Sequence, residues 1–216
     1  SELTHREYLY RSAFELGRHV IGYELQSVMA LVDWIERQSG ANDPKIGVFG
    51  YGEGGMLALY AGAVDERIDA VGVSGYFDER ERMWEQPIDR NVFGLLEQFG
   101  DAELAAMIVP RGLVIEAAEG PTLSLPGKGG APAELKTPST AHILAEIQRA
   151  RNLLRGYPGE APIRLIMGDQ LSFGSEPALS SFMAIFAPGL PLAPVTELRS
   201  FVEAPYYVQA REKRLI

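Results

Sequence analysis

Apolar residues recur along the chain with two periods, which predict alternating helices and strands. Between His19 and Gln38 they return every three or four positions, the spacing of an amphipathic helix. Shorter runs rich in Val and Ile are apolar at almost every position, which is typical of strands buried on both faces. Four such runs are predicted as strands: Lys45–Phe49, Ile68–Ser74, Leu113–Ala118 and Ile163–Met167.

Helices are predicted between and after these strands. They are Met56–Val64, Asn91–Phe99, Asp101–Ile108 with Asp101 as N-cap, a helix from Thr137-Pro138-Ser139 to about Leu154, and Ser175–Ile185. Apolar strands that alternate with helices indicate a parallel sheet covered on both sides. The expected fold class is therefore α/β.

Two segments fall outside this alternation. The stretch 119–138 is dense in Gly and Pro and is expected to be one long loop, either a functional lid or a mobile segment. From Ala187 the chain is rich in Pro and expected to be extended. We therefore expect one domain over residues 1–186 and an extended tail over 187–216 that leads to a further segment.

Composition narrows the classes of function. The chain has 216 residues, of which 46% are hydrophobic and 23% charged, as in soluble globular proteins. A net charge of −9 argues against a nucleic-acid partner, and no apolar run approaches the ~20 residues of a membrane span. Without cysteine, thiolate catalysis and cysteine-bound zinc are excluded. We expect no metal and no cofactor.

The ends of the sequence indicate a piece of a longer protein. The first residues, Ser1 to Arg6, include neither an initiator Met nor an apolar leader. The last ones, Arg211 to Ile216, resemble the basic start of another element. We expect the first strands of the sheet to lie upstream of Ser1. The remainder of the parent protein, or a second chain, would then complete the sheet.

A glycine cluster follows the first predicted strand and allows two interpretations. Gly50, Gly52 and Gly55 match the dinucleotide fingerprint G-x-G-x-x-G, in which a tight turn brings a helix N-terminus to a pyrophosphate. Asp78, roughly 20 residues further on, would then hold a ribose. Against this interpretation, Glu53 places a negative charge in the phosphate-binding turn, and a long helix precedes the strand.

The second interpretation is a nucleophile elbow, G-x-Ser-x-G, in which a strained turn lifts the serine above the sheet. With Gly50 and Gly54 as its two glycines, Gly52 occupies the serine position. Three stretches then resemble the acetyl-xylan-esterase and dienelactone-hydrolase-like branch of the α/β hydrolases. They read GRHVIGYELQSVMALVDWIERQ, KIGVFGYGEGGMLALYAGAVDERIDAVGVSGYFDERE and PRGLVIEAA. The resemblance covers roughly residues 10 to 120.

This resemblance implies a triad of Ser, an acid and His in chain order. Gly52 has no side chain that could attack a substrate. The acid position falls on Glu119, just past the third strand, or on Glu116 within it. Where the family places its histidine, this chain has residues 168–174, GDQLSFG. Two of the three triad positions, those of the serine and the histidine, therefore lack the expected residue. The histidines of the chain are His5, His19 and His142.

The remaining candidates have ordinary structural explanations beside functional ones. Glu53 would be a carboxylate nucleophile if the elbow were shifted by one residue, or else a first-turn acid that interacts with the helix dipole. Asp169 is either a pocket residue or a solvated loop charge, and Ser74 either a site residue or a turn residue. His142 is expected at the surface near a helix start. The charge run 78–85, DERERMWE, is expected to be a solvated face of mixed sign.

Three functional hypotheses follow. The preferred one is a non-catalytic α/β-hydrolase-like domain that keeps a structural or ligand-binding role. The second is an ester or peptide hydrolase that uses Glu53 and Glu119, or residues outside this chain. The third is a dinucleotide-binding enzyme. The candidate elbow and pocket consist of seven residues: Gly50, Tyr51, Gly52, Glu53, Gly54, Gly55 and Asp169.

Overall fold

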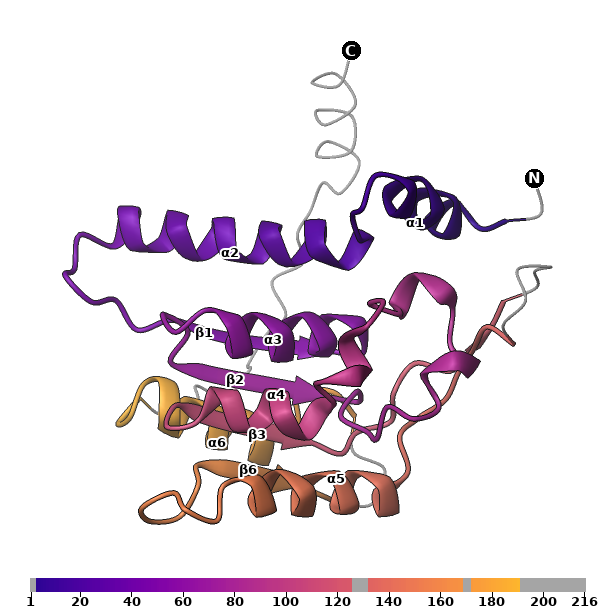
Figure 1. Cartoon of the computed structure of the whole chain (residues 1–216). Coiled ribbons are helices and arrows are strands. Elements are labelled where there is room, and N and C mark those ends of the chain that lie inside the picture. Colours follow the sequence, from indigo (N-terminus) through magenta and orange to yellow (C-terminus); the bar gives the residue numbers. More distant parts are fainter. Residues whose placement is uncertain (1–2, 126–131, 169–171, 191–216) are drawn as a thin grey trace, which may run out of the picture.

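The computed structural model of the chain describes residues 3–125, 132–168 and 172–190 (Figure 1). Its regular elements are α1 His5–Glu15, α2 Val20–Ser39, β1 Gly47–Tyr51, α3 Glu53–Val64, β2 Ala70–Ser74, η1 Met83–Glu85, η2 Ile88–Arg90, η3 Leu95–Glu97, α4 Asp101–Ile108, β3 Gly112–Glu116, β4 Leu123–Ser124, β5 Glu134–Leu135, α5 Thr140–Leu153, β6 Ile163–Ile166 and α6 Glu176–Phe186.

The main sheet has four strands in the order β1-β2-β3-β6, and all its pairings are parallel. Each of its strands overlaps one of the four apolar runs, and helices connect the strands (Figure 1). β1 begins and ends two residues later than its predicted run, and β3 begins one residue earlier and ends two residues earlier than predicted. The parallel α/β fold predicted from the sequence is therefore confirmed. The side chains of β2 and β3 are buried at every position, because helices cover both faces of the sheet.

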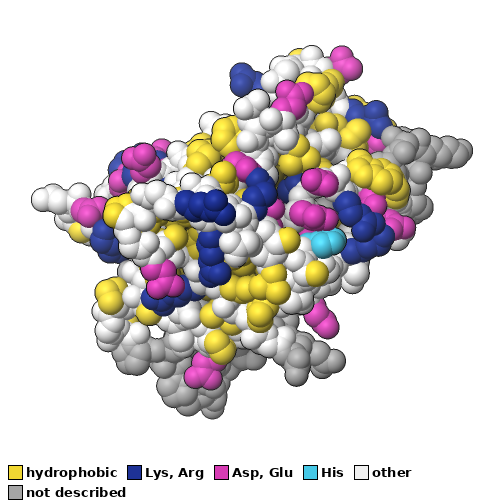
Figure 2. All heavy atoms as spheres, turned by 60° about the horizontal axis from the view of Figure 1, so that its bottom comes forward, with side chains coloured by type: hydrophobic (Ala, Val, Ile, Leu, Met, Phe, Trp, Pro, Cys, Tyr) yellow, Lys and Arg dark blue, Asp and Glu magenta, His cyan; other side chains and the backbone are white. Residues whose placement is uncertain are grey.

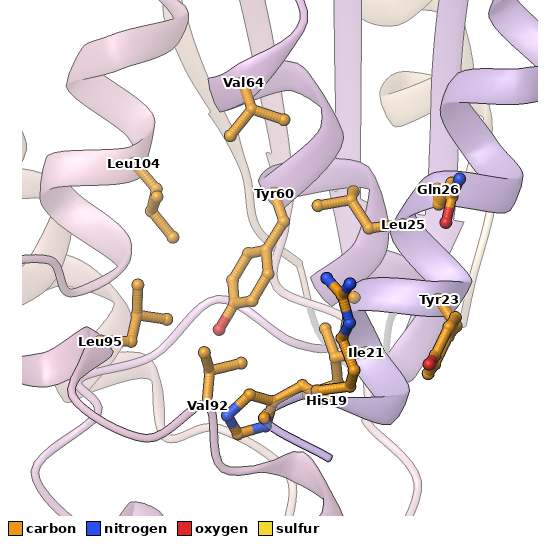
Figure 3. A pocket seen from close by; sticks show the side chains of 13 residues that line it. His19, Ile21, Tyr23, Leu25, Gln26, Tyr60, Val64, Val92, Leu95 and Leu104 are labelled. Atoms are coloured by element: carbon orange, nitrogen blue, oxygen red, sulfur yellow. The ribbon is translucent and has the colours of Figure 1, made fainter. Parts of the chain in front are cut away.

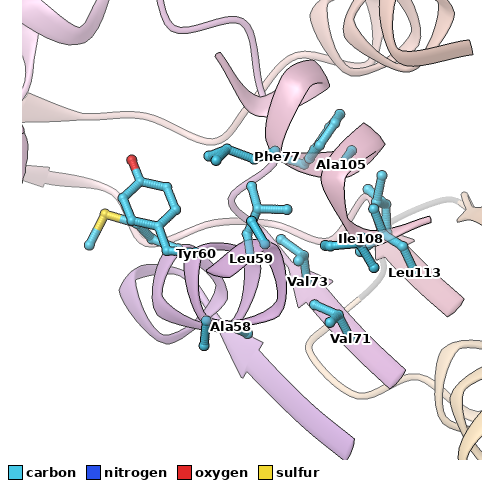
Figure 4. Packing of buried hydrophobic residues seen from close by; sticks show 14 of the residues in the cluster. Ala58, Leu59, Tyr60, Val71, Val73, Phe77, Ala105, Ile108 and Leu113 are labelled. Carbon is cyan, nitrogen blue, oxygen red and sulfur yellow. The ribbon is translucent and has the colours of Figure 1, made fainter. Parts of the chain in front are cut away.

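Two groups of buried side chains lie on opposite faces of this sheet. Alternate residues of a strand point to opposite sides, so Val71 and Val73 of β2 face one side and Ala70 the other. The larger core packs these valines, with Leu113 of β3, against α3 and α4 (Figure 4). The smaller core packs Ala70 with residues of β3 and α6, so α6 covers the second face.

Local sequence explains how the two N-terminal helices begin and end. The predicted helix over 19–38 is α2, and Gly40 ends it in the left-handed conformation with φ +65°. The helix α1 was not predicted from the sequence. Its N-cap is Thr4, whose hydroxyl oxygen accepts the N–H of Glu7 at 3.1 Å.

Some predicted boundaries are wrong. The segment 91–99 is helical only in the single 3₁₀ turn η3, because Gly94 takes φ +78° and breaks the helix. Asp101 is the first residue of α4 rather than its N-cap, which is Gly100. The expected loop 119–138 contains the short hairpin β4–β5, apart from residues 126–131, which lie outside the described part. From residue 191 the expected tail also lies outside the described part.

β1 lies at one edge of the sheet. Among the described residues it pairs with β2 alone, and its positions are only partly buried. No helix in the described part of the chain is long and apolar enough to cross a membrane.

Candidate functional site

The glycine cluster forms a sharp turn between β1 and α3. Gly52 has φ +54° and ψ −117°, a backbone conformation that favours glycine. Its N–H donates to the carbonyl oxygen of Ser74 at 2.9 Å, and its own carbonyl accepts the N–H of Met56 at 3.1 Å. At Gly50 a β-carbon would clash with the carbonyl group of Gly54, so the strand passes directly against the first turn of α3. The strand–turn–helix arrangement needed by both interpretations is present.

The space in front of Gly52 is filled by Pro121. A β-carbon at Gly52 would lie 2.9 Å from Cγ and 3.0 Å from Cδ of that proline. The cavity that remains beside them has a volume of about 20 Å³, lined by residues that include Asp78, Arg80 and Arg90. That is room for about one water molecule. A pyrophosphate or an ester substrate would require Pro121 to move.

Glu53, the alternative nucleophile, is held in a network of ion pairs. One carboxylate oxygen contacts Nη2 of Arg6, and the other accepts from Nη2 of Arg90 at 2.9 Å. Arg6 also bonds Glu24 of α2 at 2.5 Å and Asp89 of η2 at 2.6 Å. These cations stabilise the carboxylate as an ion-pair partner and reduce its strength as a nucleophile. The network also connects α1 and α2 to the start of α3.

The two candidate acids have different surroundings. Glu119 is exposed, and only its backbone carbonyl contacts the elbow, where it accepts the hydroxyl of Tyr51 at 2.9 Å. Glu116, at the end of β3, is 1% exposed. Its carboxylate accepts the hydroxyl of Ser74 at 2.5 Å and the N–H groups of Gly174 and Ser175 at 3.0 and 2.8 Å. Glu116 therefore joins β2, β3 and the turn before α6, so Ser74 and Glu116 have a structural role.

The described histidines do not reach the elbow glycine. His142, at the start of α5, is only partly exposed, and Nδ1 lies 3.3 Å from Asp78 and Nε2 3.5 Å from Glu79. Both ring nitrogens therefore face acidic side chains. Burial raises the pKa of Asp78, against the lowering effect of Arg80 and His142. His5 is exposed on α1, and His19 precedes α2, so neither lines the cavity at Gly52.

The charge run 78–85 is only partly a solvated face, which corrects the sequence interpretation. Charged side chains of both signs are interspersed with hydrophobic ones on the face shown in Figure 2. Arg80, however, is 5% exposed, and its Nε and Nη2 bond the carboxylate of Asp101 at 3.0 and 2.6 Å. Its guanidinium also lies 3.7 Å above the ring of Tyr76. The run of alternating charges did not reveal that one arginine is directed inward.

The structure brings part of the predicted site together. Tyr51 and Glu119 meet through one hydrogen bond, whereas Glu53 points to the arginines of other segments. Asp169 lies outside the described residues. Sequence reasoning missed Pro121, Arg6 and Arg90, since no local pattern marks a proline or an arginine that reaches the turn from a distant segment.

Comparisons with known proteins find distant similarity to hydrolases. No protein-family model matches the chain. A hydrolase of Bacillus subtilis, provisionally named and called YtaP, is 25% identical over 109 residues, which are 48% of this chain and 36% of that protein. The chain therefore spans about a third of the length of this curated relative.

Solved structures of esterases share the fold. A glucuronoyl esterase of Sporotrichum thermophile matches 89% of this chain and 60% of its own, with 18% identity and a TM-score of 0.56. A Bacteroides fragilis protein, provisionally named an acetyl xylan esterase, matches 79% of this chain and 42% of its own, with 16% identity and a TM-score of 0.54. A carbohydrate esterase family 15 glucuronoyl esterase of Caldicellulosiruptor kristjansonii matches 87% of this chain and 55% of its own, with 16% identity and a TM-score of 0.52. The chain thus shares the α/β fold of these esterases, with a parallel sheet flanked by helices that matches part of their length.

Proposed function

We propose that this chain is a non-catalytic α/β-hydrolase-like domain, which keeps the scaffold of the esterases and lacks their serine chemistry. The observation that carries the proposal is the elbow itself. The turn has the strained backbone that a nucleophile elbow requires, yet its central residue is Gly52, and Pro121 fills the adjacent space. Covalent catalysis needs an activated nucleophile at that point, and glycine offers none.

The surroundings of Gly52 support the same proposal, because the described residues there offer no histidine that could act as a general base. A serine nucleophile depends on an imidazole within hydrogen-bonding reach. In the described part of the chain, the residues around the cavity at Gly52 include no histidine. The nearest acidic replacement, Glu53, is engaged by two guanidinium groups. Asp78 lines this cavity, and its carboxylate accepts the N–H of Glu79 at 2.9 Å and lies 3.3 Å from Nδ1 of His142.

Hydrolysis of an aryl acetate tests the proposal. We expect the chain to release no more aryl alcohol than the same protein after unfolding, a control for hydrolysis by surface groups. We expect the Glu53→Gln variant to hydrolyse the aryl acetate no faster than the unchanged chain. The same is expected of the control variant Glu97→Gln, which changes an exposed residue distant from the turn in sequence. A fluorophosphonate probe is expected to label none of them.

Two results would contradict this expectation. Turnover that is lost in Glu53→Gln and kept in Glu97→Gln would assign the chemistry to Glu53, with the elbow shifted by one residue. Turnover that both variants keep would place an active nucleophile elsewhere. Circular dichroism of each variant establishes that it is folded.

We also propose that the open edge of β1 is covered in the parent protein, either by its remaining strands or by a second chain. The support is the partial burial of β1 beside the fully buried β2 and β3. An open sheet edge with unpaired backbone groups invites pairing with another strand. Amide hydrogen exchange in β1 should be slower in the longer parent protein than in this chain, and equal rates in both would contradict the proposal.

A further inference from the structure

An apolar groove lies between helices α2, α3 and α4. The start of α2, the C-terminal half of α3, α4 and the loop before it enclose a volume of about 440 Å³ (Figure 3). This volume is within the range of about 300–1,000 Å³ that is common for ligand pockets. The groove shares no lining residue with the small cavity at Gly52. Its role is therefore independent of the proposed loss of hydrolase activity.

The floor of the groove is apolar and its shape is fixed by the core. Ile21, Tyr60 and Leu104 line it and are 2%, 7% and 6% exposed. Leu25 of α2 packs against the same core, and Val64 at the end of α3 is 55% exposed at the rim. Together these side chains offer a continuous surface that an alkyl chain could cover and thereby remove from water.

At one end of the groove, the side chains of Arg18 and His19 have polar groups without a hydrogen-bond partner among the described residues. Arg18 is the one charged side chain in the described lining, and the structure gives its guanidinium no hydrogen bond or ion pair with a described residue. By contrast, other arginines such as Arg67 and Arg149 contact two or more carboxylates. Beside Arg18, Nδ1 of His19 is buried without a hydrogen-bond partner among the described residues. A buried nitrogen of this kind normally finds a partner, because its lost hydration is otherwise uncompensated.

We propose that this groove binds a small amphipathic carboxylate, of the class of medium-chain fatty acids. Its carboxylate would accept from Arg18 and its alkyl chain would lie along Leu25, Tyr60 and Leu104. The positive sign of Arg18 selects an anion, since the described lining holds no carboxylate that could attract an amine. The guanidinium matches a carboxylate in geometry, and the apolar floor provides the remaining binding energy.

Calorimetric titration of the full chain with decanoate, below the concentration at which it forms micelles, tests this proposal. Decanol is the matched ligand with the same chain and no charge. We expect saturable binding of one decanoate per chain. Arg18→Gln should weaken decanoate binding about tenfold and leave decanol binding unchanged, because one charge-assisted contact is lost. Arg151→Gln, an exposed change on α5 outside the groove, should change neither.

A second variant tests the position of the alkyl chain. Val64→Phe at the exposed rim should fill part of the groove and weaken decanoate and decanol alike. Absence of saturable binding, or an equal loss of both ligands in Arg18→Gln, would overturn the proposal. Sedimentation that finds a dimer of the unchanged chain and a monomer of Val64→Phe would overturn it too, because a second copy would then occupy the groove.

Discussion

Replacing Asp101 by Asn is expected to lower the free energy of unfolding by about 3 kcal/mol, because the change leaves the buried charge of Arg80 without its counter-ion. Asp101 is 1% exposed, and besides both bonds from Arg80 it accepts the N–H of Asp78 at 3.1 Å. Arginine stays charged at any pH compatible with folding, so it cannot adapt by losing its proton. Urea unfolding followed by circular dichroism measures the difference.

Two further variants separate the cost of breaking the Arg80–Asp101 ion pair from the net contribution of that pair to stability. Burial raises the pKa of Asp101 against the lowering effect of Arg80, so the lost hydration of the carboxylate opposes its attraction to the guanidinium. We therefore expect the double variant Arg80→Met/Asp101→Leu to be more stable than Asp101→Asn. Glu85→Gln weakens the ion pairs with the exposed cations Arg82 and Lys136 and should change the stability little, because both cations remain in contact with water. Equal losses in all three proteins would mean that the segment packs differently.

The sheet and the glycine turn between β1 and α3 could be predicted because their signals are local. Each strand is a short run of apolar residues, and the close approach of β1 to α3 requires small residues at fixed spacing. At Gly50 and Gly52 the requirement is visible in the sequence, since a tight turn and a positive φ both select glycine. The resemblance to esterases rests on this same stretch, and the solved structures share the fold over most of the chain.

The missed features depend on residues that are distant in sequence. The helix α1 is largely polar, and its ion pairs from Arg6 reach Glu24, Glu53 and Asp89. A pattern of residues cannot tell an arginine in water from one that bonds a carboxylate of a distant element. For the same reason the burial of Arg80 was invisible within a run of mixed charges. The space in front of Gly52 is filled by Pro121, which is far from this glycine along the chain and adjacent to it in space.

Replacing Gly50 by Ala is expected to have the largest effect of any single change, a loss of more than about 4 kcal/mol or of folding altogether. The new β-carbon would clash with the carbonyl group of Gly54 and lie 2.7 Å from the backbone nitrogen of Gly55. Both are backbone groups of the first turn of α3, so no side chain can rotate to make room. Relief would require β1 and α3 to separate, which would open the core between them. Thermal unfolding of the purified variant, or its absence from the soluble fraction, measures the effect.

Gly54→Ala is the matched control, because it adds the same methyl group to the other side of that contact. No atom lies within 4 Å of the β-carbon it would add, and the residue is exposed in the first turn of α3. We expect this variant to unfold at the same or a slightly higher temperature, since alanine favours a helix by roughly 0.5–1 kcal/mol over glycine. If Gly50→Ala were as stable as Gly54→Ala, the strand would not pass so close to the helix. The turn would then not have the tight geometry on which the proposal of Gly52 at a nucleophile position depends.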